Sequence, residues 1–270
     1  MNETNGSNNG TPATGSADPT GAESKVMVAM ERAREAMEAF ADASQAEVDR
    51  AVTAVAWSLY DPSNAHALAR LAVDDTGLGN VADKIIKNQR KTFGTLRDLL
   101  RAKTVGMIDH DPARGMTRYA KPVGVVAAVT PSTNPAATPI NKTMMAVKGG
   151  NAIVIAPSPS GWNTTAEAVR LARAELAKVG APPDLVQVLP KPVTRADTEE
   201  LMAAADLVVA TGSQNNVRRA YHSGTPAIGV GAGNVPVIID STADLDDAAA
   251  KIAASKTFDN ATSCSSENSL

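Results

Sequence analysis

A single cysteine lies near the end of the chain, within a run of small polar residues. Cys264 is the only cysteine among the 270 residues, and positions 259–268 around it carry hydroxyl, amide, acidic and methyl side chains. A cysteine that serves only packing behaves as a small hydrophobe and prefers apolar neighbours, whereas an accessible thiolate is a nucleophile. A lone cysteine is also consistent with a buried, inert thiol. The assignment therefore depends on what the rest of the chain builds around Cys264.

Composition limits the class of protein. Hydrophobic residues make up 43% of the chain and charged residues 20%, which suits one or two globular domains with a core. The net charge is −3 and there is no basic patch, so we expect no nucleic-acid partner. No apolar run approaches the roughly 18 residues that span a bilayer, and no secretory leader is recognisable, so we expect neither membrane association nor secretion.

One cysteine cannot form an internal disulfide, which fits a reducing cytoplasm. The histidines are far apart and lack metal-ligand spacing, so no metal site is expected; they are His66, His110 and His222. Residues 1–22 are mostly Asn, Gly, Ser, Thr and Pro, a composition that predicts a disordered tail.

Helices are expected next. From Glu23, apolar residues recur at three- and four-residue steps, and further helices are predicted over residues 45–60, 63–75 and 81–100. The pair Asp61-Pro62 separates two of them. Residues 105–121 predict a two-stranded hairpin with its turn at 109–114.

Strands and helices then alternate. Strands are predicted at residues 124–130, 152–156, 185–189, 207–211 and 235–239, and helices at 139–147, 164–179, 194–204 and 215–221. Such alternation implies right-handed crossovers and a parallel sheet. The fold class is α/β, with N-terminal helices followed by a Rossmann-like parallel sheet. A last helix, over residues 244–255, leads into the cysteine segment.

Ligands of open parallel sheets bind beyond the carboxyl ends of the strands. The first such end carries Thr130-Pro131-Ser-Thr-Asn134-Pro135, in which two prolines hold a carboxamide in place. Asn134 is either a helix cap, a role that asparagine fills well, or a donor to a substrate. Spacing alone does not separate these alternatives.

Two further strand ends are candidates for cofactor binding. Ser158 and Pro159 follow the second strand, where a dinucleotide fold often places an acid for the ribose, but no acid stands between residues 151 and 167. A plain Ser- and Pro-rich turn is the alternative. Thr211, Gly212 and Ser213 precede a helix whose N-terminus suits phosphate or the nicotinamide side of a cofactor. The alternative there is a glycine needed only for the turn.

Five short segments, in order along the chain, resemble the CoA-acylating aldehyde dehydrogenases: residues 119–124, 130–135, 210–213, 224–234 and 256–260. The resemblance extends from about Glu23 to the end of the cysteine segment. It implies an aldehyde-dehydrogenase-like fold, with a nucleotide-binding domain over residues 23–242 and the beginning of a second, catalytic α/β domain over residues 243–270. Because such proteins continue further, we expect the chain to be truncated, and a homo-oligomer when full length.

The resemblance also implies residue roles. Cys264 attacks an aldehyde, Asn134 donates its amide to the oxyanion, NAD or NADP takes the hydride, and CoA takes the acyl group. Gly231 and Gly233 belong to a loop that lies beneath the cysteine in the family and that carries a glutamate in hydrolytic members. No acid stands between residues 206 and 240 here, which favours CoA over water as acceptor.

Other possibilities remain open at this point. They are a hydrolytic aldehyde dehydrogenase, a semialdehyde dehydrogenase of amino-acid synthesis, and a nucleotide-binding module without catalysis. The acid missing after the second strand favours NADP over NAD. The segment Thr262-Ser-Cys264-Ser-Ser-Glu-Asn-Ser269 is most similar to family members that act on sulfoacetaldehyde, with acetaldehyde and propionaldehyde as alternatives.

Overall fold

The computed structural model describes residues 24–231 and 233–269, and the tail predicted for residues 1–22 lies outside this range. Four helices come first: α1 (Lys25–Ala39), α2 (Gln45–Tyr60), α3 (Pro62–Thr76) and α4 (Val81–Leu99). Local signals set their ends. Ser44 and Glu47 form a capping box at the start of α2, and the Asp61 side chain accepts two backbone N–H bonds at the start of α3. The predicted N-terminal helices are confirmed.

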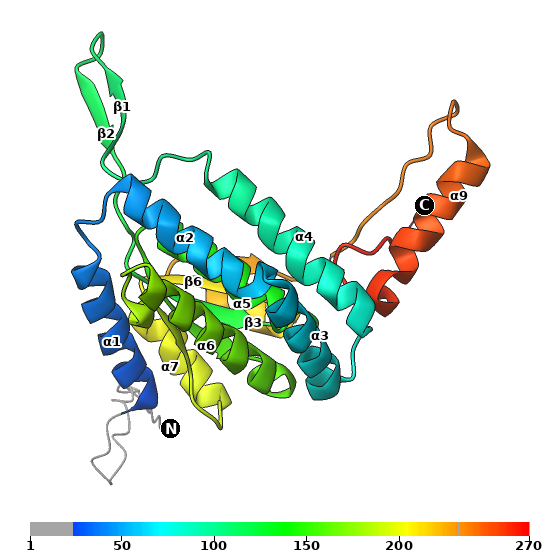
Figure 1. Cartoon of the computed structure of the whole chain (residues 1–270), viewed down its shortest axis with the longest axis horizontal. Helices are drawn as coiled ribbons and strands as arrows, with labels where there is room; N and C mark the ends of the chain where they lie inside the picture. The colour runs from blue at the N-terminus through cyan, green and yellow to red at the C-terminus, as the bar shows by residue number, and fades with distance from the viewer. Residues whose placement is uncertain (1–23, 232, 270) are drawn as a thin grey trace, which may run out of the picture.

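An antiparallel hairpin, β1 (Met107–Asp111) and β2 (Met116–Tyr119), follows and projects from the body of the molecule (Figure 1). The hairpin was predicted, but its turn lies at residues 112–115, later than expected.

The body is one parallel sheet with the strand order β5-β4-β3-β6-β7. Its strands are β3 (Val125–Thr130), β4 (Ala152–Pro157), β5 (Val186–Val188), β6 (Leu207–Thr211) and β7 (Ala227–Val230). Every residue of β3 and β4 is buried, as expected for central strands covered on both faces. The chain runs from β3 to β4 and β5 on one side and then crosses to β6 and β7 on the other. The direction of winding therefore reverses between β3 and β6, and such a reversal opens a crevice at the carboxyl ends of the strands. The predicted α/β class is confirmed.

Helices cover both faces of this sheet (Figure 1). Right-handed crossovers place α5 (Ala137–Lys148) and α6 (Trp162–Lys178) on one face, with α2 packed on both. They place α7 (Arg195–Ala204) and α8 (Gln214–Tyr221) on the other face, where α1 packs beside α7. Finally, α4 packs on α3 and α5, and its Lys84 contacts the Thr133 carbonyl in the loop after β3.

The prediction of a last strand at residues 235–239 is wrong. The edge strand is β7, and residues 235–239 form no strand apart from a single bridge between Pro236 and Ser269. The apolar residues 235–239 have strand propensity but little to pack against among the described residues, and Ile238 is 91% exposed. The strand β7 contains Gly229, and a glycine is needed there because a Cβ would lie 2.5 Å from Val217 Cγ1.

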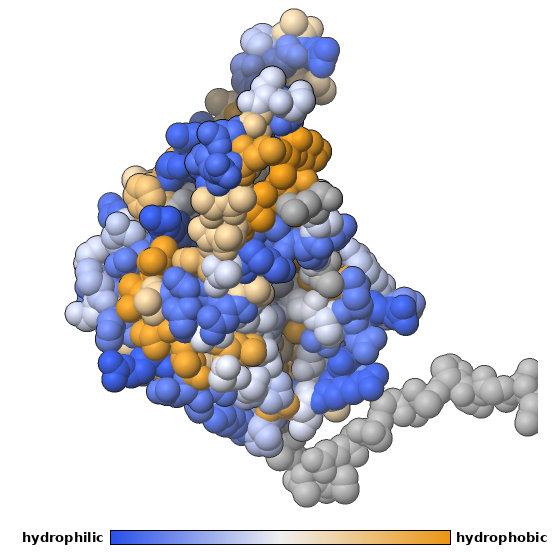
Figure 2. All heavy atoms as spheres, turned by 90° about the vertical axis from the view of Figure 1, so that its right-hand side faces the viewer, coloured by the Kyte–Doolittle hydropathy of each residue, from blue (hydrophilic) through white to orange (hydrophobic). Residues whose placement is uncertain are grey.

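The helix α9 (Leu245–Thr257) extends away from the sheet and buries none of its residues (Figure 1). A short turn of 3-10 helix, Phe258–Ala261, joins α9 to the cysteine segment. The face that lies on the right-hand side of Figure 1 has apolar patches among hydrophilic side chains (Figure 2). The domain division at residues 242 and 243 stays a prediction.

Candidate active site

A cavity of about 790 Å³ lies at the carboxyl ends of β3, β4, β6 and β7. Every predicted catalytic and cofactor-binding residue lines it: Thr130, Pro131 and Asn134 after β3, Ser158 and Pro159 after β4, Thr211, Gly212 and Ser213 after β6, Gly231 and Gly233 after β7, and Cys264. Residues separated by as many as 134 positions thus share one wall. Their individual roles stay predictions.

The loop after β3 presents the Asn134 amide to the cavity. Ala136 is the N-cap residue of α5, and no side chain caps that helix, so the capping alternative for Asn134 is wrong. Its amide nitrogen lies 3.5 Å from Thr133 Oγ1, the limit of a hydrogen bond, and the residue is 9% exposed. A buried carboxamide with such a weak bond retains the capacity to donate to a ligand.

Thr130 offers a second polar group. Its side chain is 2% exposed, and its Oγ1 has no hydrogen-bond partner in the described part of the chain. The Thr130 carbonyl accepts from the backbone N–H of Ser158 at 3.0 Å, which joins the loops after β3 and β4. A buried hydroxyl without a partner in a cavity wall fits a site whose polar ligand completes it.

The Thr211–Ser213 turn opens α8. Ser213 Oγ accepts from the Asn216 N–H at 3.3 Å and caps the helix, while Gly212 has a φ of +149° and donates its N–H to the Val230 carbonyl at 3.1 Å. Gly212 is therefore needed for the turn, as the alternative proposed. It also lines the cavity, so the two roles are compatible. Because glycine has no side chain, the cavity wall consists of backbone at this position.

The glycine-rich loop lies directly against the cysteine. A Cβ at Gly233 would stand 2.5 Å from the carbonyl oxygen of Cys264. Asn268 ties the two segments together, since its Oδ1 accepts from the Val235 N–H at 2.7 Å and its Nδ2 donates to the Gly233 carbonyl at 3.3 Å. The thiol itself is free and exposed. The alternative of a buried cysteine is wrong, and the reactivity of the thiol stays a prediction.

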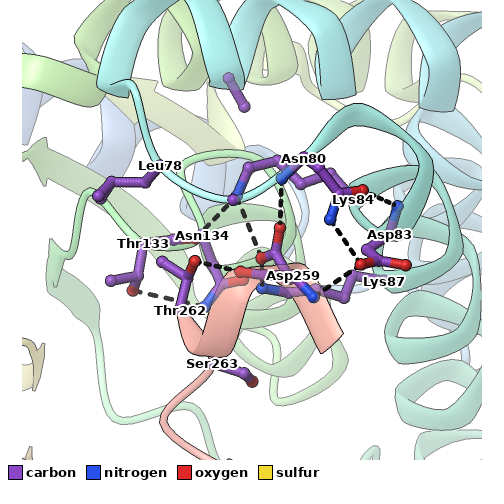
Figure 3. Close-up of polar contacts among 12 residues, drawn as sticks. Leu78, Asn80, Asp83, Lys84, Lys87, Thr133, Asn134, Asp259, Thr262 and Ser263 are labelled. Atoms are coloured by element: carbon purple, nitrogen blue, oxygen red, sulfur yellow. Dashed lines mark hydrogen bonds and ion pairs between the residues drawn. The ribbon is translucent and has the colours of Figure 1, made fainter. Parts of the chain in front are cut away.

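A buried charge cluster joins α4 to the residues just before the cysteine segment (Figure 3). Asp259 is fully buried, and its carboxylate forms ion pairs with Lys84, at 3.2 Å, and with Lys87, both from α4. The backbone N–H of Asn80 donates to the same carboxylate at 3.1 Å. In return, the Asp259 N–H donates to Asp83 Oδ2 at 2.7 Å. Burial lowers the pKa of Lys87, against the hydrogen bond and charge of Asp259, which raise it.

The backbone at this cluster is strained. Asp259, Asn260 and Ala261 have φ values of +52°, +53° and +57°, the left-handed region that non-glycine residues rarely occupy. Each such residue costs of order 1 kcal/mol, and the surrounding contacts must hold it. The turn before α4 packs closely against Asp259, because a Cβ at Gly79 would lie 1.9 Å from Asp259 Oδ1.

Sequence reasoning missed the charged part of the site. Lys84, Lys87 and Lys91 stand at steps of three and four and so share one face of α4, a signal that was available in the spacing. Two arginines also line the cavity, and both pair with one carboxylate: Glu199 Oε1 lies 3.0 Å from Arg195 Nε and 3.1 Å from Arg219 Nε.

A further buried lysine lies beneath the crevice. Lys142 Nζ donates to the carbonyls of Val129, at 2.9 Å, and Val209, at 2.6 Å, and so joins the ends of β3 and β6. Burial lowers the pKa of Lys142 to about 7. Among the described residues no cluster of acid, His and Cys side chains could hold a metal ion, and no helix there is long and apolar enough to cross a bilayer.

Comparison with known proteins identifies the family of the chain. The chain matches the aldehyde dehydrogenase family over residues 8–270. It is 62% identical over 245 residues to a sulfoacetaldehyde dehydrogenase (acylating) from Cupriavidus necator, covering 91% of this chain and 50% of that protein. The chain thus belongs to the aldehyde dehydrogenase family, and the resemblance to its acylating members is confirmed.

Solved structures give the same result. An acetylating aldehyde dehydrogenase from Geobacillus thermoglucosidasius is 41% identical with a TM-score of 0.86, covering 90% of this chain and 54% of that one. A propionaldehyde dehydrogenase from Rhodopseudomonas palustris, with bound CoA and an acylated cysteine, is 31% identical with a TM-score of 0.79, covering 90% and 55%. The chain spans about half the length of these three relatives.

Proposed function

We propose that the protein to which this chain belongs oxidises an aldehyde to an acyl-CoA, with NAD(P) as hydride acceptor and a thioester on Cys264 as intermediate. The observation that carries this proposal is the shared cavity wall, where Cys264 and Asn134 stand together with the loops that follow the strands of a Rossmann-like sheet. The relatives named acylating dehydrogenases support the same reaction.

The chemistry begins at Cys264. Its thiolate adds to the aldehyde carbon, and the carbonyl becomes an oxyanion. The Asn134 amide and the Cys264 backbone N–H are the donors to that oxyanion, and one such donor contributes about 3 kcal/mol to the transition state. The bound nicotinamide supplies the acceptor for the hydride that leaves the tetrahedral carbon. The product on the enzyme is a thioester, which the CoA thiol cleaves to acyl-CoA and free Cys264.

CoA rather than water is the proposed acceptor. Water needs a base within hydrogen-bonding reach, and no carboxylate lines the cavity in the described residues. A thiol is intrinsically the better nucleophile and needs less assistance. A hydrolytic enzyme is therefore disfavoured by the side chains that surround Cys264.

The residues present fit a nicotinamide dinucleotide. The unpaired Thr130 hydroxyl, the Thr211–Ser213 turn and the Ser158 loop supply polar groups along the crevice. NADP is proposed over NAD because two guanidiniums, Arg195 and Arg219, share a single carboxylate in this wall and retain positive charge for a phosphate.

Sulfoacetaldehyde is the proposed aldehyde, with sulfoacetyl-CoA as product. The resemblance of the cysteine segment and the 62% identical relative support this substrate. We also propose a cytoplasmic location and a homo-oligomer, on the single cysteine and on the family resemblance respectively.

The test is the reaction of the complete protein with sulfoacetaldehyde and NADP, followed by absorbance with and without CoA. We expect a burst of reduced cofactor without CoA, sustained turnover only with CoA, and loss of turnover in Cys264→Ala with cofactor affinity retained. Sustained formation of free acid without CoA would assign the protein to the hydrolytic class. Turnover of Cys264→Ala within tenfold of the parent would refute the nucleophile assignment.

A further inference from the structure

A second cavity, of about 290 Å³, lies between α4 and the cysteine segment. Its walls are Ile86, Lys87, Arg90 and Lys91 of α4 on one side, and Phe258, Ala254, Ser255 and three serines beside Cys264 on the other. Lys91 and Ser263 line this second cavity and the first one. The two spaces therefore adjoin at the nucleophile, on the side of α4.

The walls of this space are cationic. The cavity is lined by Lys87, Arg90 and Lys91 and by no carboxylate of the described residues. The nearby acids already have partners. Asp259 pairs with Lys84 and Lys87, and Asp83 accepts from the Asp259 N–H.

Glu267, the remaining acid of the segment, accepts from Ser255 Oγ at 2.5 Å and lines neither cavity. In the part of the chain that the structure describes, Arg90 and Lys91 have no ion-pair partner. Positive charge therefore exceeds negative charge at this wall.

Position separates Lys91 from the other cations of the first cavity. Arg195 and Arg219 line that cavity too, but each pairs with Glu199. They come from α7 and α8, beside the loops proposed for the dinucleotide. Lys91 comes from α4 and shares its wall with Ser263, the residue before Cys264. It is the cation of the described residues best placed to meet the acyl side of a substrate.

The substrate proposed above has a matching charge. In sulfoacetaldehyde the sulfonate is attached to the carbon next to the carbonyl, so it must bind close to the thiol that attacks that carbonyl. Reacting atoms approach to about 3–3.5 Å before bond formation. A sulfonate stays anionic at neutral pH and presents three acceptor oxygens, which suit an ammonium, a guanidinium and hydroxyl donors.

We propose that Lys91, supported by Arg90 and by the serine hydroxyls beside Cys264, forms the binding subsite for the anionic group of the aldehyde. The subsite rests on the proposed function for its substrate and extends it by naming the residues that select an anionic aldehyde. A neutral aldehyde leaves these cations without a partner, which is the basis of selection against it.

The chain offers a direct test that needs no turnover, because Cys264 is its only thiol. Three methanethiosulfonate reagents transfer a methyl, a sulfonatoethyl or a trimethylammonioethyl thio group to the thiolate, releasing methanesulfinate. The sulfonatoethyl group places a sulfonate beside the cysteine sulfur. Rates of loss of the free thiol give the preference of the site for anion over cation, and the methyl reagent corrects for any change in thiolate reactivity.

We expect the sulfonate reagent to react about 10- to 100-fold faster than the cationic reagent, a range typical of charged hydrogen bonds. Lys91→Met should abolish most of this preference and keep the methyl reagent within about twofold, while Lys91→Arg should retain it. Lys103→Met removes an exposed lysine outside both cavities and serves as the control. An unchanged preference in Lys91→Met, with native circular dichroism, would overturn the proposal.

A second arm distinguishes the substrate sulfonate from the phosphates of CoA. In the complete protein, Lys91→Met should raise KM for sulfoacetaldehyde about 10-fold or more and leave KM for CoA and for acetaldehyde nearly unchanged. A selective rise in KM for CoA would assign the subsite to CoA and overturn the proposal. If the complete protein shows no aldehyde oxidation, the proposed function fails while the labelling result still reports on the anion subsite.

Discussion

Asp259→Asn tests whether the buried charge cluster holds the site. Asparagine has the same shape and tolerates the left-handed backbone about as well as aspartate, so the substitution removes the charge and little else. It leaves the ammonium groups of Lys84 and Lys87, which are 4% and 3% exposed, without their carboxylate. Removal of one partner from a buried ion pair costs about 3–5 kcal/mol. Total stabilities are about 5–15 kcal/mol, so the loss should be large.

The loss should depend on pH in a defined direction. Burial already lowers the pKa of Lys87, and Asp259 opposes that lowering, so without Asp259 the pKa falls further below its unfolded value near 10.4. The unfolded state then binds more protons than the folded state, and stability rises with pH up to about 10.4. The deficit of Asp259→Asn relative to the parent should be largest near neutral pH and shrink toward pH 10.

Urea unfolding followed by circular dichroism at pH 7 and pH 10 measures both effects. Asp259→Asn combined with Lys87→Met removes one ammonium as well and should recover a large part of the loss. Asp98→Asn, an exposed carboxylate beside Arg97, is the matched control and should change stability little. A loss below about 1 kcal/mol at pH 7, or a deficit that grows with pH, would show that the cluster does not hold the segment in this way.

Two further predictions concern the cavity wall. Arg195→Ala should raise the dissociation constant of NADP about tenfold or more and leave that of NAD nearly unchanged, because the 2′-phosphate loses a charged donor. Fluorescence titration measures both constants, with Arg170→Ala, at an exposed arginine, as control. Equal weakening of both cofactors would contradict this prediction. Gly233→Ala should lower kcat about 10- to 100-fold in the complete protein, because a Cβ 2.5 Å from the Cys264 carbonyl must displace the nucleophile. Gly94→Ala, in an open part of α4, should leave kcat unchanged, and a normal kcat in Gly233→Ala would refute the close fit.

Much of the fold followed from local pattern. Buried strands such as residues 124–130 are continuous apolar runs between turn signals, and the helices carry their own caps, as at Ser44 and Asp61. The last strand was predicted at the wrong place because strand propensity favoured residues 235–239, whereas the edge strand of the sheet is Ala227–Val230. Gly229 lets β7 pack closely against α8, and this tertiary contact cannot be predicted from the order of residues in the chain.

The site was predictable to a similar extent and for a similar reason. Loops after parallel strands meet at one edge of the sheet, so Thr130, Ser158 and Thr211 were expected to lie together once the alternation was seen. The partners of Asp259 were not predictable in this way. They lie more than 170 positions earlier in the chain, on a helix outside the sheet, and only the tertiary fold brings them to the cysteine segment.

Helix α4 connects the two halves of the proposed chemistry. Lys84 donates to the Thr133 carbonyl at 3.4 Å, beside Asn134, and pairs with Asp259, five positions before Cys264 (Figure 3). One side chain thus contacts the loops of the proposed oxyanion donor, Asn134, and of the proposed nucleophile, Cys264. Because these loops belong to segments about 130 residues apart, their relative position has to be set by an element that touches both. A shift of about 1 Å between such groups can cost 100-fold in rate, so we expect α4 to help set the proposed catalytic geometry through Lys84.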